Sequence, residues 1–366
     1  MRIDSACRLD RRSPPAVARR LVKRMAALSL AGILVIGPAH AATESQSRQP
    51  VALAAADAAS ARLPTLRMGN CDFVDLAAWA KTKSLRLSWV STNSIVGLTN
   101  RSNRLRGSVG SRQLEINGVK TWLSSPITSR NGLLYITTLD MRTLLDPILV
   151  PVRNKPGQRV RVIALDPGHG GRDPGFKVGK EQEKVLTLLW ARRLKARLEQ
   201  AGFEVILTRA RDVYIGLDDR VAAAWRARAD LFISLHYNAA SEGSAAVKGV
   251  ETYCLTPAGA PSTNVQPEQQ GSTAKLPGNT QDTHNILLAY HVQKSMVTRM
   301  RVEDRGVRRA RFVVLRNTDM PAILVEGGFL STPDEARRIA DPTQRDLLAK
   351  AVVEGVLAYK RLVERR

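Results

Sequence analysis

The sequence predicts an α/β fold in which a mostly parallel sheet is flanked by helices on both faces, over residues 158–366, preceded by a small β-rich domain over residues 63–153. In the C-terminal range, short apolar runs alternate with longer amphipathic segments, the pattern of parallel strands joined by helices. Several of these runs are nearly continuously apolar, as strands covered on both faces are. In the N-terminal range, strand-like runs follow one another with turn signals between or beside them.

Residues 1–41 have the three parts of a secretory signal peptide. A basic stretch ends at residues 23–24, an apolar run follows over about 25–36, and Ala-His-Ala at 39–41 places small residues where a signal peptidase reads. The apolar run is shorter than the ~20 residues of a bilayer span, so we expect export with cleavage and no stable membrane span afterwards. An uncleaved membrane anchor is the alternative. Residues 42–62, rich in Ala, Ser and Gln, are typical of a linker.

The composition is basic, with 56 Lys and Arg, 33 Asp and Glu and a formal net charge of +23. Residues 1–41 contain eight of these basic and two of these acidic residues, so a net charge of +17 remains after cleavage. Such a charge favours polyanionic partners, but export argues against nucleic acid. Only 5% of residues are aromatic, which argues against extended aromatic binding platforms. For Cys71 and Cys254 we expect unpaired, buried thiols, although the sequence leaves a disulfide open.

The N-terminal range begins as a series of short strands. The strand-like runs are LRLSWV (85–90), SIVGLT (94–99) and LLYITT (133–138). Asn-Gly turn signals stand at 117–118 and 131–132. Through EINGVKTWLSSPI and NGLLYITTLDMRTLLDPIL this range resembles the small domain called copper-amine-oxidase-like N-terminal. No set of metal ligands accompanies these segments, so the resemblance implies no copper here. A binding role, a spacer role and simple packing all stay open.

Asn-Lys-Pro-Gly at 154–157 marks the boundary between the two ranges. Beyond it we expect strands at 161–166, 203–208, 231–236, 249–255, 311–316 and 322–329. We expect helices at 183–200, 218–229, 286–300 and 346–363. A polar insertion rich in Pro, Gly, Gln and Ser, residues 256–283, separates a strand from the following helix. Loops of this length are usually functional or disordered.

Residues able to bind a metal stand at the ends of three predicted elements. His169 lies in the Asp-Pro-Gly-His-Gly-Gly turn after the first strand, Glu183 begins the next helix, and His236 ends another strand. Since sites in open α/β sheets form at the carboxyl edges of the strands, we expect these groups to converge. Two imidazoles and one carboxylate make a zinc set of the His2Glu type, with a fourth position open. Glu326, at another strand end, is then the general base and acid.

Each of these residues alone has an ordinary interpretation. A histidine in a Gly-rich turn is usually a turn or surface residue. An acid in the first turn of a helix is favoured there by the helix dipole, and an acid at a strand end can serve in a salt bridge. Chance rarely places all four at converging edges, so their joint arrangement favours a site.

Four segments carry a specific family resemblance: DPGHGG, EKVLTL (183–188), RADLFISLHYNAA and MPAILVEGGFLS. Over about residues 160–363 they resemble, in family order, the zinc-dependent N-acetylmuramoyl-L-alanine amidases of the amidase-3 family. The resemblance implies one Zn²⁺ held by His169, Glu183 and His236, with Glu326 as the catalytic glutamate. Glu181 is the main rival ligand, but the Lys-x-x-x-Leu that follows Glu183 favours Glu183.

The resemblance implies hydrolysis of the amide between N-acetylmuramic acid and L-alanine of the peptidoglycan stem peptide. The expected location is the periplasm, otherwise the extracellular space or cell wall. Candidates for substrate binding are Asn238, Glu251, Arg308 and Arg309. The last two belong to a basic cluster for which a solvated surface is the alternative: Arg301, Arg305, Arg308, Arg309, Arg311 and Arg316.

The chain departs from the family pattern at three positions. Gly327 stands where Thr is usual, Thr332 where Asn is usual, and Tyr237 is bulkier than the usual small residue. None removes a reacting group, so they concern the shape of the substrate groove.

Some family members carry a regulatory segment at the place of residues 256–283, so an activator protein acting there is a possible partner. The insertion lacks an apolar face suited to a plugging helix, which favours a mobile flap. Two other functions stay open: a degenerate module that binds wall without cutting it, and a zinc peptidase that cuts within stem peptides. A nucleic-acid-binding protein is a more distant alternative.

Overall fold

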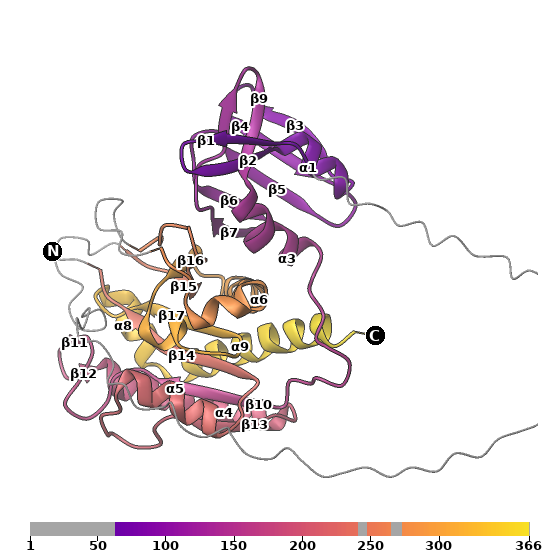
Figure 1. The fold of residues 1–366 in the computed structure, drawn as a ribbon. Helices are drawn as coiled ribbons and strands as arrows, with labels where there is room; N and C mark the ends of the chain where they lie inside the picture. Colours follow the sequence, from indigo (N-terminus) through magenta and orange to yellow (C-terminus); the bar gives the residue numbers. More distant parts are fainter. Residues whose placement is uncertain (1–62, 241–246, 265–272, 366) are drawn as a thin grey trace, which may run out of the picture. The chain divides into compact units, whose positions relative to one another are not determined.

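A sheet of eleven strands organises the part of the chain that the computed structural model describes, residues 63–240, 247–264 and 273–365 (Figure 1). Its C-terminal strands are β10 (Val162–Pro167), β13 (Glu204–Leu207), β14 (Leu231–Asn238), β15 (Val250–Leu255), β16 (Asp304–Ala310) and β17 (Ala322–Phe329). Its N-terminal strands are β3 (Arg86–Ser91), β4 (Ile95–Thr99), β5 (Arg104–Ser108), β6 (Gln113–Ile116) and β7 (Val119–Trp122). The strand order is β13-β10-β14-β17-β15-β16-β7-β6-β5-β4-β3. The predicted signal peptide and linker lie outside the described residues.

The C-terminal part of this sheet is mostly parallel, as predicted. β13, β10, β14 and β17 are parallel neighbours, whereas β15 runs antiparallel to β17 and parallel to β16. Only residues 239–249 connect β14 to β15, which is shorter than a crossover between parallel strands requires. β15 therefore enters the sheet in the opposite direction, and the sheet is mixed.

Helices cover both faces of this part, which confirms the predicted architecture. They are α4 (Glu183–Gln200), α5 (Leu217–Arg226), α6 (Asp282–Met300), α7 (Val313–Arg316), α8 (Pro333–Ala340) and α9 (Pro342–Val363). Because successive side chains of a strand point to opposite faces, β14 supplies two cores. Leu231 and Ile233 pack with Trp190 in the core under α4, α6 and α9. Phe232 packs with Val221 in a second core under α5 and α7.

The strand predicted at 311–316 is wrong. The strand of this region is β16, just before that segment, and the apolar run folds into α7, whose Val314 and Leu315 are buried in the α5–α7 core. β16 has the sequence DRGVRRA, which lacks the apolar alternation of a half-buried strand. It is stabilised instead by ion pairs and hydrogen bonds with partners far away in the sequence.

The two Asn-Gly turns of the N-terminal range form as predicted. Asn117 and Gly118 have φ of 50° and 80°, and Asn131 and Gly132 have φ of 51° and 76°, which is the geometry of tight hairpin turns. The remaining elements here are β1 (Thr65–Met68), β2 (Cys71–Asp75), α1 (Leu76–Thr82), β8 (Thr128–Arg130), β9 (Leu133–Thr137), α2 (Thr138–Asp140), the π-helical η1 (Met141–Leu145) and α3 (Asp146–Leu149).

The N-terminal strands join the C-terminal ones through backbone pairing between β7 and β16. Thr121 lies opposite Val307 in this parallel pair, and the Lys120 amide donates to Oδ2 of Asp304 at 2.7 Å. Residues 63–365 accordingly form one structural unit. The domain limits predicted from the sequence, 63–153 and 158–366, stay predictions.

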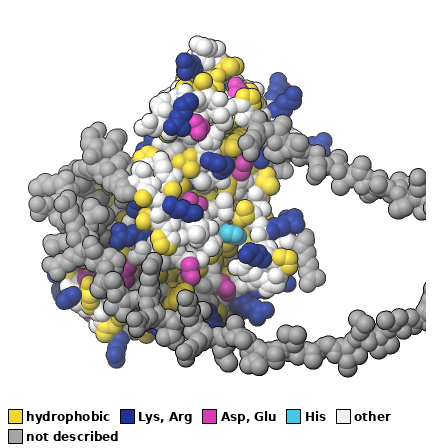
Figure 2. Space-filling view, in the orientation of Figure 1, with side chains coloured by type: hydrophobic (Ala, Val, Ile, Leu, Met, Phe, Trp, Pro, Cys, Tyr) yellow, Lys and Arg dark blue, Asp and Glu magenta, His cyan; other side chains and the backbone are white. Residues whose placement is uncertain are grey.

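Basic side chains are dispersed on the face shown in Figure 2, where Lys and Arg lie among acidic and apolar side chains. Within the described ranges, no helix combines the length and the apolar character needed to cross a membrane. Cys71 is partly exposed and Cys254 is buried, and both thiols are free. The prediction of unpaired cysteines is confirmed, but the predicted burial is wrong for Cys71.

Candidate active site

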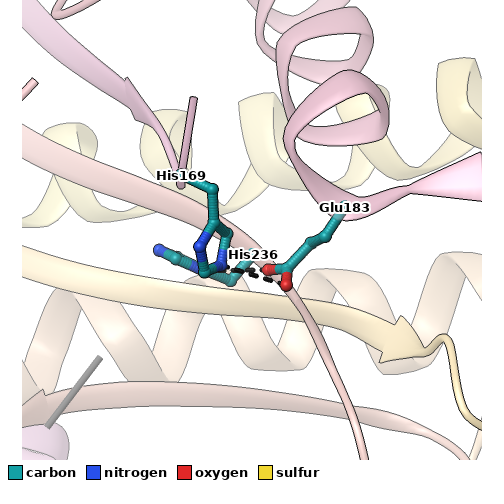
Figure 3. A group of neighbouring side chains, drawn as sticks. All are labelled: His169, Glu183 and His236. Atoms are coloured by element: carbon teal, nitrogen blue, oxygen red, sulfur yellow. Dashed lines mark hydrogen bonds and ion pairs between the residues drawn. The ribbon is translucent and has the colours of Figure 1, made fainter. Parts of the chain in front are cut away.

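The structure brings His169, Glu183 and His236 together. One ligand atom from each lies within 4.8 Å of the others, and the three side chains point toward one another (Figure 3). Nε2 of His169 lies 3.0 Å from Oε2 of Glu183, and Nδ1 of His236 lies 3.0 Å from Oε1 of the same carboxylate. Glu181 is exposed in the short hairpin of β11 (Lys177–Val178) and β12 (Glu181–Gln182), outside this cluster.

The backbone of the Gly-rich turn places His169 beside the other two side chains. His169, Gly170 and Gly171 follow one another with φ of 62°, 129° and 58°, a conformation that is costly for a side chain larger than glycine. Gly168 is required because a Cβ there would lie 2.2 Å from Cε1 of His236. A Cβ at Gly175 would lie 2.5 Å from Oε2 of Glu183. Both glycines leave room for the ligand side chains.

The Glu183 carboxylate is held in its ionised form by its hydrogen-bond donors. It is buried, which by itself would raise its pKa, but the hydrogen bonds from His169 and His236 hold that pKa well below its usual value. Its carboxylate also accepts the backbone amides of Phe176 at 3.0 Å and Tyr237 at 3.1 Å. These donors fix both oxygens in place, so the carboxylate faces the two imidazoles.

Asp173 orients the ring of His169, and the sequence analysis did not identify it. Its Oδ2 lies 2.9 Å from Nδ1 of His169, so Nε2 is directed at Glu183. A carboxylate on the second nitrogen of a ligating histidine is the usual support of a metal site. Two imidazoles, one ionised carboxylate and this support fit Zn²⁺.

Glu326 lies in one cross-strand row with His236 and Glu251. His236 is paired with Glu326 between β14 and β17, and Glu326 with Glu251 between β17 and β15. Directly paired residues of neighbouring strands point to the same face of a sheet. His236 lies four residues after Phe232 on β14, so this row continues the face of the α5–α7 core at its carboxyl edge.

Glu326 is the free acid of the site. Its Oε2 is buried and has no hydrogen-bond partner in the ranges that the structure describes. Burial, followed by the negative charges of Glu183 and Glu251, raises the pKa of Glu326 well above its usual value, against the smaller effect of His169. A buried carboxyl oxygen without a partner can bind or move a proton, whereas one held by donors cannot do so without breaking contacts.

Glu251 is the opposite case, because donors surround its carboxylate. Oε1 lies 2.7 Å from Nε of Arg305 and 3.2 Å from Nε of Arg308. Oε2 accepts from the Tyr253 hydroxyl at 2.7 Å and from Nδ2 of Asn238 at 3.2 Å. Three of the predicted substrate-binding residues, Asn238, Glu251 and Arg308, therefore form one hydrogen-bonded and ion-paired group beside Glu326.

The structure does not bring Arg309 to this group, which corrects its predicted place in substrate binding. Alternation along β16 turns Arg309 to the face opposite Arg308. Its guanidinium is buried there and donates to the Thr143 carbonyl at 2.9 Å. Arg311 likewise donates to the Ala260 carbonyl at 2.7 Å, so the six arginines of the basic cluster do not form one surface.

Two departures from the family pattern compensate for each other in the core. Tyr237 is buried with its ring centroid 5.4 Å from that of Trp190. A Cβ at Gly327 would lie 2.9 Å from Cε1 of Tyr237. The larger Tyr237 thus occupies the space that a side chain at 327 needs, and both departures lie in the core. Thr332 is buried and donates to the Val247 carbonyl.

A histidine pair and a carboxylate beside a free acid, at the carboxyl edge of an α/β sheet, form the arrangement of metal-dependent hydrolases. A family model described as N-acetylmuramoyl-L-alanine amidase matches residues 163–358. The chain belongs to this family, and residues 163–358 are its amidase domain. The family and the fold class predicted from the sequence are confirmed.

Two relatives agree with this assignment in sequence. The chain is 37% identical over 230 residues to the N-acetylmuramoyl-L-alanine amidase AmiC of Neisseria meningitidis. The match covers 57% of this chain and 55% of that protein. The chain is 31% identical over 232 residues to AmiA of Escherichia coli, covering 57% and 79%. A solved amidase structure from Clostridium difficile is 34% identical and covers 55% of this chain and 97% of its own, with a TM-score of 0.45. The chain thus spans about half the length of the Neisseria relative.

Proposed function

We propose that this chain cuts peptidoglycan by hydrolysing the amide between the lactyl group of N-acetylmuramic acid and L-alanine of the stem peptide. The observation that carries the proposal is the convergence of three ligand atoms within 4.8 Å, one strand away from a carboxylate with a free, buried oxygen. Membership of the amidase family supports the choice of bond.

Zn²⁺ would be held by Nε2 of His169, the Glu183 carboxylate and Nδ1 of His236. When bound, zinc lowers the pKa of a water ligand to about 7 and polarises the scissile carbonyl. Asp173 keeps the tautomer of His169 that leaves Nε2 free for the ion. The resemblance of residues 63–153 to the copper-amine-oxidase-like domain adds no metal to this proposal.

Glu326 moves the proton in this mechanism. Its free Oε2 takes a proton from the attacking water and returns it to the departing amide nitrogen, a contribution of typically ~10²–10⁴-fold. Glu251 cannot take this role, because three hydrogen-bond donors and an ion pair with Arg308 occupy its oxygens. Glu251 instead holds Arg305 and Arg308 at the rim, where anionic groups of the stem peptide would bind.

Export through residues 1–41 to the periplasm, or otherwise to the extracellular wall, is part of the proposal, because the substrate lies outside the cytoplasm. An activator protein acting on residues 256–283 is its regulatory part. Of this segment, 256–264 and 273–283 are described, and the Gly259 amide donates to the Thr273 carbonyl at 2.9 Å. A deletion of 265–272 keeps both partners of this bond, and a large gain in basal activity would support autoinhibition.

Digestion of purified sacculi, with zinc content measured on the same protein, tests the proposal. The expected product is a free stem peptide with L-alanine at its amino terminus. A shortened peptide would identify a peptidase instead. Binding without any released product would identify a degenerate wall-binding module.

A further inference from the structure

Two buried arginines that no sequence motif singled out hold the loop of His169. Arg209 follows β13 and Arg220 lies in α5, and both side chains are buried. Their guanidiniums converge on three consecutive carbonyls, those of Pro167, Gly168 and His169. Pro167 is the last residue of β10, so the backbone leaves the sheet within this group of carbonyls.

Arg209 also connects this loop to the helix that carries Glu183. Its Nη2 donates to the Gly168 carbonyl at 2.7 Å and to the Lys184 carbonyl at 2.8 Å. Its Nε donates to the Pro167 carbonyl at 2.9 Å. Thr187 adds a second connection, since its hydroxyl donates to the Gly168 carbonyl at 3.0 Å. The residues next to two proposed ligands thus share one guanidinium.

Arg220 extends the same network toward His236. Its Nη2 donates to the His169 carbonyl at 2.7 Å, and its Nη1 donates to Oδ1 of Asp166 at 2.8 Å. The other oxygen of Asp166 accepts from the Ser234 hydroxyl at 2.8 Å, two residues before His236 on β14. For each of the three proposed ligands, the residue itself or one within two positions of it is therefore hydrogen-bonded to Arg209, Arg220 or Asp166.

We propose that Arg209 and Arg220 are positioning residues of the metal site, which set the affinity for the ion by fixing the left-handed His169 backbone against the first turn of α4 and the end of β14. The inference rests on the proposed zinc site. A guanidinium has five donors in a rigid plane, whereas a lysine ammonium has three on a flexible stem. Lysine therefore keeps the charge but loses two of the five donors and the rigid plane that directs them at carbonyls of two segments.

The test compares zinc dissociation constants, measured by competition with a chromophoric chelator, for the whole chain carrying Arg209→Lys or Arg220→Lys. The matched control is Arg309→Lys, which changes an equally buried arginine whose guanidinium, within the described residues, donates to Thr143. We expect zinc binding 10–100-fold weaker than wild type for the first two variants, with turnover restored by excess zinc. The control should lower Tm similarly while keeping wild-type zinc affinity.

Two milder substitutions at threonines keep the test decisive if the arginine variants do not fold. Thr187→Val removes one bond to the Gly168 carbonyl and should weaken zinc binding about three- to tenfold. Thr143→Val, a threonine that also contacts a buried arginine, should leave it unchanged. Equal zinc affinities in a folded Arg209→Lys and wild type, or in the two threonine variants, would overturn the inference alone. A wild-type chain that binds no zinc would overturn the proposed metal site and the inference together.

Discussion

Replacing Glu326 by glutamine separates catalysis from stability and metal binding. The substitution keeps the size of the side chain and removes its titratable oxygen. Because Oε2 has no partner in the described chain, the substitution removes no hydrogen bond of this oxygen. The burial and the charges of Glu183 and Glu251, which raise the pKa of Glu326, no longer oppose folding once the carboxyl group is gone.

The expected magnitudes follow from these contacts. Turnover should fall by ~10²–10⁴-fold, which corresponds to about 2.7–5.5 kcal/mol of transition-state free energy. The free energy of unfolding should not decrease. In the metal-free protein a raised folded pKa means that wild type loses stability as the pH rises above 4.5, the ordinary value of a glutamate. The advantage of Glu326→Gln should therefore grow with pH from that point.

Release of labelled fragments from sacculi measures turnover, urea unfolding measures stability, and elemental analysis measures zinc. Glu354→Gln on α9, which alters a surface ion pair with Arg299 of α6, is the control and should leave turnover unchanged. Digestion by Glu326→Gln at the wild-type rate would refute the assigned role. Loss of zinc together with activity would show that Glu326 supports the metal rather than the proton transfer.

Three further outcomes are expected. Asp166→Ala leaves the guanidinium of Arg220 buried without its ion pair and should cost about 3–5 kcal/mol in urea unfolding; a loss below ~1 kcal/mol would contradict this. Burial raises the pKa of Cys254 to about 11, so near pH ~8.5, where free thiols titrate, iodoacetamide should modify Cys71 first in mass spectra, and equal rates would count against it. Chelation of zinc should lower Tm, because an ion at 100 times its Kd adds about 2.7 kcal/mol.

The elements with a strong local signal were predictable. The helix expected at 183–200 has those limits in the structure, because its apolar spacing and the glycine after it act locally. α9 begins at Pro342, earlier than the predicted 346, since the Asp341 side chain caps its first turn by accepting the Thr343 amide. β16 was missed because its arginines are satisfied by distant partners.

The candidate site was predictable to a similar degree. His169, Glu183, His236 and Glu326 stand at element ends, and the rule that parallel strands end at one edge brings such positions together. Arg209 and Arg220 lie 40 or more residues from the loop that they hold, and no spacing along the chain reveals which carbonyl a guanidinium will reach.

The sequence by itself determined the alternation of strands and helices, the family and the four side chains that face one another at the sheet edge. These features depend on periodicity and on turn chemistry, which act over a few residues. The tertiary structure alone decided which acid stays free: Glu326 and Glu251 lie opposite each other on neighbouring strands, yet donors reach only Glu251. It also turned Arg308 toward the site and Arg309 away from it, since the register of a buried strand selects the face that each side chain meets.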